Sequence, residues 1–192
     1  MTARNQGPQD AELIRACQQG QAQAGVELVD RYWDRVYAFA FRLTSNQADA
    51  EDIAQEVFLR AFTRLEEFEP GGQFKAWLLR IATNFFLDEK KAAKSREVAL
   101  DETHEPPQRG PTLERSQEQH ELLAAVDEVM QTFSKEQRTV VLLRAMEQME
   151  YTEIADILRV KESTVRWHMY EARRIMRSRL SEKFDLEALC HE

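Results

Sequence analysis

The sequence predicts an all-α protein with two small helical domains joined by an extended linker. Two stretches, 49–91 and 118–180, place apolar residues at the three- and four-residue spacing of a helix face. Residues 92–115 hold three of the five prolines and no sustained apolar period, which is typical of a linker. We therefore expect a flexible leader at 1–9, a first domain at 10–94, a linker at 95–117, a second domain at 118–180 and an acidic tail at 181–192.

Composition narrows the function. The 192 residues are 43% hydrophobic and 31% charged, and no apolar run approaches the roughly 18 residues of a membrane span, so we expect a cytoplasmic protein without membrane insertion. A net charge of −8 argues against coating DNA by bulk electrostatics, so any DNA contact must come from local basic patches or from a partner. The spacing of cysteines and histidines predicts no metal, no cofactor and no enzyme site.

The first domain should begin with a short helix. Asp10 is its expected N-cap and Gly20 its expected end. A long helix follows at about 24–43, with apolar residues at helical spacing. Asn46 is the predicted N-cap of the next helix, and Asp49 lies in its first turn, where negative charge is favoured.

Residues 49–91 predict two helices separated by a turn at Pro70-Gly71-Gly72, which cannot continue a helix. The second helix should begin near Gln73. Its predicted apolar stripe is Phe74, Trp77, Leu78, Ile81, Ala82 and Phe85, with Leu79, Phe86 and Leu87 off the stripe. This helix has more apolar surface than one core contact uses.

Two interpretations of the aromatic residues in this region remain open. Aromatic stripes usually pack in a core. Alternatively, aromatic faces stack on unpaired bases while nearby lysines and arginines follow the phosphates. The residues concerned are Phe68, Phe74, Trp77, Phe85 and Phe86.

The segments DAEDIAQEVFLRAF and FKAWLLRIATN together resemble region 2 of the extracytoplasmic-function (ECF) sigma factors, a branch of the bacterial sigma-70 family. The resemblance implies that the first of the two helices docks on the beta-prime clamp of core RNA polymerase, through Asp49, Asp52, Gln55, Glu56 and Arg60. It also implies that the loop and the second helix capture flipped bases of the promoter −10 element, through Phe68, Phe74, Lys75, Trp77, Arg80 and Asn84.

The second domain should hold four helices. Ser134 and Gln137 form a capping-box pattern. Thr152 is the predicted cap of the next helix, a turn follows at 159–161, and the last helix runs from Ser163 to Leu180. Small or apolar residues where the last two helices cross make this a helix-turn-helix pattern.

The outward face of the last helix offers groups that suit phosphates and base edges in a major groove. They are Ser163, Thr164, Arg166, Trp167, Tyr170, Arg173 and Arg174. Following the first domain and the linker, the block from Phe133 to Leu180 resembles sigma region 4, the reader of the −35 element. Three features depart from the family pattern: Arg159 in the turn, the Trp167-His168 pair, and Glu171, which would repel a nearby phosphate.

The sequence therefore predicts a promoter-specificity subunit. Its expected partners are core RNA polymerase, through the beta-prime clamp and the beta flap, and promoter DNA; an anti-sigma factor is a further expectation from the family resemblance. The alternative is a helix-turn-helix regulator that acts without recruiting polymerase, which the acidic net charge and the aromatic residues of the first domain disfavour. The tail is expected to pack on the second domain, with regulator binding as the alternative.

Overall fold

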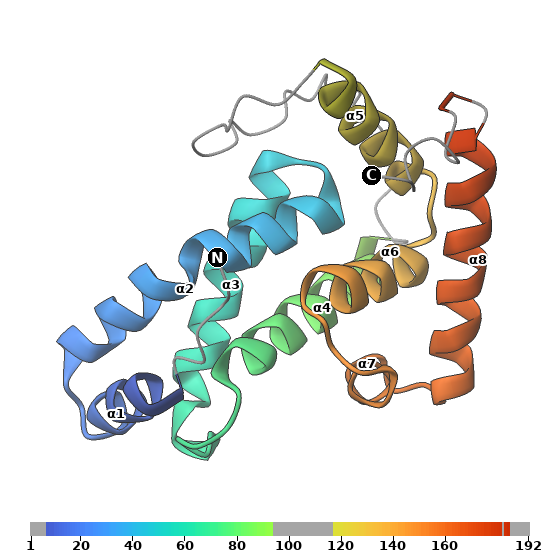
Figure 1. Cartoon of the computed structure of the whole chain (residues 1–192). Helices are drawn as coiled ribbons and strands as arrows, with labels where there is room; N and C mark the ends of the chain where they lie inside the picture. Colours follow the sequence, from blue (N-terminus) through green and yellow to red (C-terminus); the bar gives the residue numbers. More distant parts are fainter. Residues whose placement is uncertain (1–6, 94–116, 182, 185–192) are drawn as a thin grey trace. The chain divides into compact units, whose positions relative to one another are not determined.

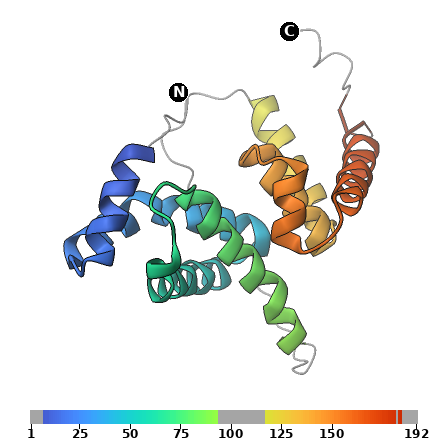
Figure 2. The ribbon, with the colours of Figure 1, turned by 90° about the horizontal axis from the view of Figure 1, so that it is seen from below.

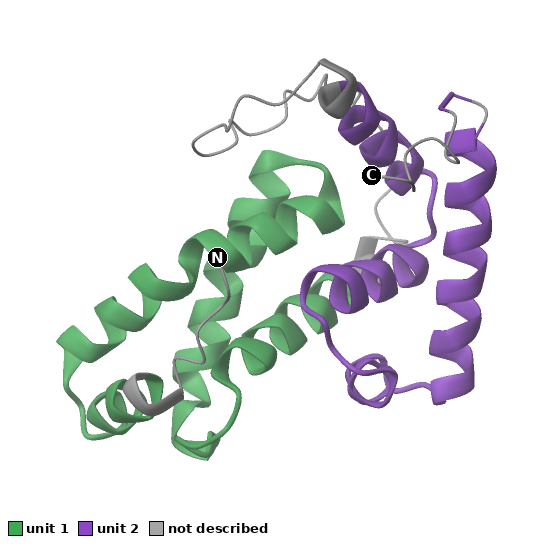
Figure 3. Cartoon of the chain, in the orientation of Figure 1, with its two compact units in different colours: residues 1–103 green, residues 104–192 purple. Residues whose placement is uncertain are grey.

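The computed structural model describes residues 7–93, 117–181 and 183–184, and every regular element within those ranges is a helix (Figure 1). They divide into two compact units, residues 1–103 and 104–192 (Figure 3). None of the described helices is long and apolar enough to cross a membrane. Most of the predicted leader, linker and tail lies outside the described residues.

Unit 1 is built around its long helix α2. It comprises α1 (Gly7–Gln18), α2 (Ala22–Thr44), α3 (Gln47–Thr63), the short 3-10 helix η1 (Leu65–Glu67) and α4 (Phe74–Ala93). Helix α2 packs against α1, α3 and α4. Leu28, Val36, Ile53, Val57 and Leu78 are among the side chains fully enclosed by these contacts.

Helix α1 is fastened at both ends. Asp10 accepts hydrogen bonds from Arg31 Nη1, at 2.7 Å, and from the Tyr32 hydroxyl. At the other end, Gln18 Nε2 donates to the carbonyls of Leu65, at 2.8 Å, and Phe68, at 2.9 Å. The N-cap prediction for Asp10 is wrong: α1 begins at Gly7, and Asp10 lies in its first turn, 7% exposed, because its carboxylate pairs with α2.

The junction between α2 and α3 confirms the predicted break. Ser45 adopts the left-handed conformation at the end of α2, with φ 56°. Asn46 then caps α3, because its side-chain oxygen accepts from the Asp49 amide at 3.0 Å.

Helix α4 buries only part of the predicted stripe. Its buried apolar residues are Phe74, Leu78, Leu79, Ala82 and Phe86. The predicted stripe members Trp77, Ile81 and Phe85 are only half-buried. The reason is that α4 packs on both α2 and α3, so its core face is wider than one stripe and is rotated toward Leu79 and Phe86.

Unit 2 is organised around its last helix. It comprises α5 (Gln117–Gln131), α6 (Lys135–Val141), the π-helix η2 (Leu142–Met146), α7 (Tyr151–Leu158) and α8 (Glu162–Ser181). Helix α8 packs against α5, α6 and α7, and Figure 2 shows it beside them from a second direction. Phe184, in the predicted tail, packs on the cluster of Ala125, Val129, Phe133, Ala172 and Leu180.

The caps of unit 2 confirm one prediction and correct another. Ser134 and Gln137 form the predicted capping box. Thr152 is not a cap: α7 begins at Tyr151, and Glu150 is its N-cap, in a reciprocal capping arrangement with Glu153. A carboxylate at this position accepts from the same free amides as a threonine hydroxyl and adds a favourable charge at the helix N-terminus.

Candidate nucleic-acid and protein interfaces

The solvent-facing side of α3 carries the residues expected to bind polymerase. Asp49, Asp52, Gln55 and Arg60 are exposed, and Glu56 is half-buried. Positions 52, 55, 56, 59 and 60 lie on one helix face, which we call the α3 outer face.

Leu59 lies on the α3 outer face, one residue before its C-terminal end, with 64% of its surface exposed. Sequence reasoning missed this residue, although its position gives the signal: an apolar side chain at a position where the helix pattern is otherwise polar. A large exposed apolar residue surrounded by charges is typical of a protein contact site.

An ion pair and a ring fix the end of the α3 outer face. Glu56 Oε1 accepts from Arg60 Nε at 2.6 Å, and the Arg60 guanidinium lies 4.7 Å from the centre of the Phe85 ring. An exposed pair of this kind contributes less than about 1 kcal/mol, so its main effect is to hold Arg60 over α4.

The loop before α4 gathers an aromatic cluster. The Phe68 ring centre lies 5.4 Å from that of Phe74 and 4.8 Å from that of Trp77. Gly72 permits this fold, because a Cβ there would meet the Phe68 ring at 3.0 Å and the Glu69 carbonyl oxygen at 3.1 Å. The stacking prediction for Phe74 is not supported: the residue is 2% exposed, its ring packs against Tyr32, and it supports Phe68 and Trp77 from within the core.

The other predicted −10 residues are accessible, Phe68 in the loop and the rest along α4. Phe68, Lys75, Trp77 and Asn84 are half-buried and Arg80 is exposed. Trp77, Arg80 and Asn84 follow one another at spacings of three and four residues, so the structure brings them to one face of α4.

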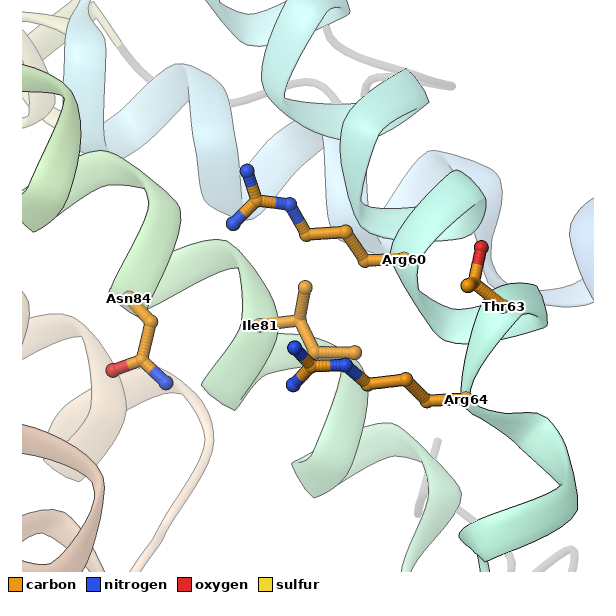
Figure 4. A pocket seen from close by; sticks show the side chains of 5 residues that line it. All are labelled: Arg60, Thr63, Arg64, Ile81 and Asn84. Carbon is orange, nitrogen blue, oxygen red and sulfur yellow. The ribbon is translucent and has the colours of Figure 1, made fainter.

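A pocket of about 230 Å³ opens between α3 and α4 beside this face (Figure 4). Its lining combines one residue expected at polymerase, Arg60, with one expected at the −10 strand, Asn84. The remaining lining residues are Thr63, Arg64 and Ile81.

In unit 2, α7 and α8 form the predicted helix-turn-helix. Ala155, Val165 and Met169 are buried where the two helices meet. Arg159 ends α7 in the left-handed conformation, with φ 55° and ψ 43°. The turn therefore keeps the left-handed shape that is usually formed by glycine. For a non-glycine residue, this backbone conformation costs about 1 to 2 kcal/mol.

The predicted −35 residues share the outward face of α8. Ser163, Arg166, Arg173 and Arg174 are exposed and Thr164 is half-buried. Trp167 is 56% and Tyr170 64% exposed, so Trp167 does not pack into the unit. His168 is half-buried rather than on the surface, and its ring centre lies 4.9 Å from that of Trp167.

Acidic neighbours hold two of these arginines. Arg166 Nε donates to Glu162 Oε1 at 2.7 Å, and its guanidinium lies 4.8 Å from the Tyr151 ring centre. Arg174 Nη2 donates to Glu171 Oε2 at 2.9 Å, so Glu171 neutralises an arginine of its own helix. Within the described part of the chain, Arg173 has no such pair.

Comparison with known proteins agrees with this geometry. The family model for sigma-70 region 2 matches residues 28–96, and that for sigma-70 region 4 matches residues 123–176. The chain is 38% identical over 157 residues to the ECF RNA polymerase sigma factor SigE of Mycolicibacterium smegmatis, covering 81% of this chain and 61% of that protein. The chain therefore spans less than two thirds of the length of this relative.

Two further matches cover nearly the whole of the other protein. The chain is 30% identical over 176 residues to the ECF RNA polymerase sigma factor SigW of Bacillus subtilis, covering 87% of this chain and 94% of that protein. The fold matches the sigma factor RpoE of Bartonella quintana, solved with the anti-sigma factor NepR, with a TM-score of 0.65, 23% identity and coverage of 82% and 97%. The chain belongs to the ECF branch of the sigma-70 family of RNA polymerase sigma factors.

Proposed function

We propose that this protein binds core RNA polymerase in the cytoplasm, brings it to promoters through the −35 and −10 elements, and helps to melt the −10 DNA. The observation that carries the proposal is the distribution of exposed groups. In a chain of net charge −8, aromatic and cationic side chains gather on the outer faces of α4 and α8. Such local patches give an acidic protein DNA contacts that its net charge opposes.

The α3 outer face is the proposed contact with the beta-prime clamp. Leu59 supplies an apolar centre, and Asp49, Asp52, Gln55, Glu56 and Arg60 surround it with polar groups. An apolar centre with a polar rim is the usual composition of a specific protein interface. Unit 2 is the proposed contact with the beta flap.

The loop and α4 are the proposed −10 surface. Phe68 and Trp77 present partly accessible rings on which unpaired bases stack, and Lys75 and Arg80 supply positive charge nearby. Asn84 offers both a donor and an acceptor to a base edge. Phe74 is left out of this set because its ring is buried.

The outer face of α8 is the proposed −35 reader. Its first turns carry Ser163, Thr164, Arg166 and Trp167, the positions from which a recognition helix reaches base edges. Tyr170, Arg173 and Arg174 follow toward the C-terminus, where phosphate contacts fix the orientation on DNA.

An anti-sigma factor is a further proposed partner. The Bartonella relative of this fold was solved with such a protein. A partner of this kind would inhibit by covering the α3 outer face or the outer face of α8.

Run-off transcription tests the proposal. Fragmented genomic DNA is transcribed by bacterial core polymerase with and without the protein, and DNA binding by the protein alone is measured in parallel. New initiation that requires both components supports the proposal and yields the promoter motif. Tight DNA binding by the isolated chain without new initiation would favour the alternative, a regulator that acts without recruiting polymerase.

Asn84→Ala separates the two functions of unit 1. We expect weaker −10 selectivity with unchanged binding to core polymerase, because Asn84 lies on α4, outside the α3 outer face. Equal loss of both would contradict the assignment of the surfaces.

A further inference from the structure

The pocket between α3 and α4 has the polar lining of an anion site. Arg60 and Arg64 reach from α3 toward Ile81 of α4, and Asn84 lies on α4 at the rim (Figure 4). Thr63 completes the lining, and none of the lining residues is acidic. Two guanidinium groups and an amide favour a ligand with negatively charged oxygens.

Within the pocket, Arg64 is the cation left without a counterion. Arg60 is paired with Glu56 at 2.6 Å and lies over Phe85. The Thr63 hydroxyl donates to the Leu59 carbonyl at 2.7 Å. Among the described residues, Arg64 and Asn84 have no hydrogen bond or ion pair from their side chains.

The spacing of the two arginines strengthens this argument. Arg64 follows Thr63, the last residue of α3, and stands four positions after Arg60, so both side chains line the same pocket. Glu56 neutralises only Arg60, and an anion held between the two guanidinium groups would also give Arg64 a partner.

We propose that this pocket binds one backbone phosphate of the single-stranded −10 DNA, with Arg64 as the principal ligand, beside the base edge that Asn84 is proposed to read. The planar guanidinium matches two phosphate oxygens at once. The inference rests on the proposed function, because it requires that α4 faces the −10 strand.

The position of the pocket favours a DNA phosphate over a carboxylate of polymerase. Trp77 and Asn84 are seven residues apart on α4, about 10 Å along the helix, so a strand stacked on Trp77 passes the pocket within a few nucleotides. Arg64 follows the C-terminal end of α3, about 18 Å along the helix from Asp52, and only Arg60 of the lining belongs to the proposed polymerase surface as well.

The test uses holoenzyme and a promoter fragment whose −10 region is already unpaired. Arg64→Gln should weaken binding several-fold at low salt and reduce the slope of log affinity against log salt by about 0.7, one single-strand phosphate's share. Arg42→Gln, which removes an exposed arginine from α2, is the matched control and should leave the slope unchanged.

A neutral methylphosphonate placed at each −10 linkage in turn locates the contact. Wild-type holoenzyme should lose several-fold affinity at one linkage, and Arg64→Gln holoenzyme should be insensitive at that same linkage. Equal sensitivity of both proteins at every linkage would overturn the proposal.

Two other outcomes are distinguishable. If Arg64→Gln weakens assembly with core polymerase in the absence of DNA, the ligand is a carboxylate of the partner protein and the phosphate proposal is wrong. If the wild-type chain directs no polymerase-dependent initiation at all, the proposed function itself has failed, whatever Arg64 does.

Discussion

Arg166 stacks on Tyr151, with 4.8 Å from its guanidinium to the ring centre, and so joins the first helix of the helix-turn-helix to the second. Arg144 lies 5.1 Å from the same ring and donates to the Met149 carbonyl at 2.8 Å. Arg166 is thus held by a ring on α7 and by Glu162 on its own helix. This arrangement orients Arg166 before DNA arrives, which reduces the entropy lost on binding.

Tyr151→Leu should therefore weaken −35 binding without unfolding unit 2. An exposed cation–π contact contributes about 0.5 to 1 kcal/mol, so we expect a two- to fivefold loss of promoter affinity in holoenzyme titrations. Tyr151→Phe keeps the ring and should bind as the wild type does. If Tyr151→Phe loses as much as Tyr151→Leu, the hydroxyl group matters and the ring does not.

The pairing of Arg174 with Glu171 gives opposite expectations for two neighbouring changes. Arg173→Ala removes an unpaired cation, so promoter affinity should fall and its salt dependence should flatten by about one phosphate's share. Glu171→Gln releases Arg174, so affinity should rise and the salt dependence should steepen. Both follow from promoter binding measured at several salt concentrations. An unchanged slope in Arg173→Ala would mean that Arg173 does not touch the backbone.

Leu59 should anchor the polymerase interface. Burying an exposed leucine side chain in an interface contributes about 1.5 to 3 kcal/mol to binding. Leu59→Gln loses this contribution and should weaken binding to core polymerase more than tenfold. Val26→Gln is the control, because Val26 is an exposed apolar residue, 51% accessible, on α2. Equal affinity of the two variants in a direct binding assay would exclude Leu59 from the interface.

The left-handed backbone of Arg159 predicts a stabilising change. Arg159→Gly should raise the free energy of unfolding of unit 2 by about 1 kcal/mol, since glycine adopts this conformation without a Cβ clash. The melting temperature should rise by about 4 to 8 °C. Arg159→Ala removes the same side chain but keeps the Cβ, so the gain should be absent. Identical melting of the two variants would show that the backbone is unstrained in solution.

His168 should make unit 2 sensitive to acid. Burial lowers the pKa of His168, an effect that the nearby Glu136 partly offsets, and its Nδ1 is buried without a hydrogen-bond partner among the described residues. The folded state therefore favours neutral histidine. The unfolded chain binds the proton first, so stability should fall as pH drops below about 6.5 and level off beneath the folded-state pKa.

Thermal denaturation of the wild type and His168→Gln at pH 7.5 and pH 5.5 measures this effect. Other titrating groups contribute equally to both proteins, so the variant should lose less stability on acidification. The same loss in both would show that His168 does not carry the pH dependence.

The sequence predicted the helices and two of the four N-caps, because apolar spacing and capping side chains are local signals. Asn46 and Ser134 were identified in this way. Asp10 and Thr152 were misassigned: the carboxylate of Asp10 pairs with residues of another helix, and Glu150 precedes the predicted cap with the same chemistry. A polar pair between two helices, such as Asp10 with Arg31, leaves no periodic trace in the sequence.

The candidate surfaces divide along the same line. Residues on the outer faces of α3 and α8 followed from the helix pattern. The burial of Phe74 did not, because the apolar spacing of one helix does not show how many other helices pack against it. The role of Tyr151 also required the fold, since Arg166 lies on another helix, and so did the position of Arg64 in a pocket whose lining includes Ile81 and Asn84 of α4.

The attachment of α1 bears on how unit 1 opens. Gln18 donates to the carbonyls of Leu65 and Phe68, which lie 47 and 50 residues further along the chain. Asp10 pairs the other end of α1 with α2. Release of α1 would leave the carbonyls of Leu65 and Phe68 without these partners, so we expect α1 and the loop that presents Phe68 to open together. A change that loosens the N-terminal helix would thus reach the proposed DNA-melting loop through the equilibrium between closed and locally unfolded states, without altering any group that touches DNA.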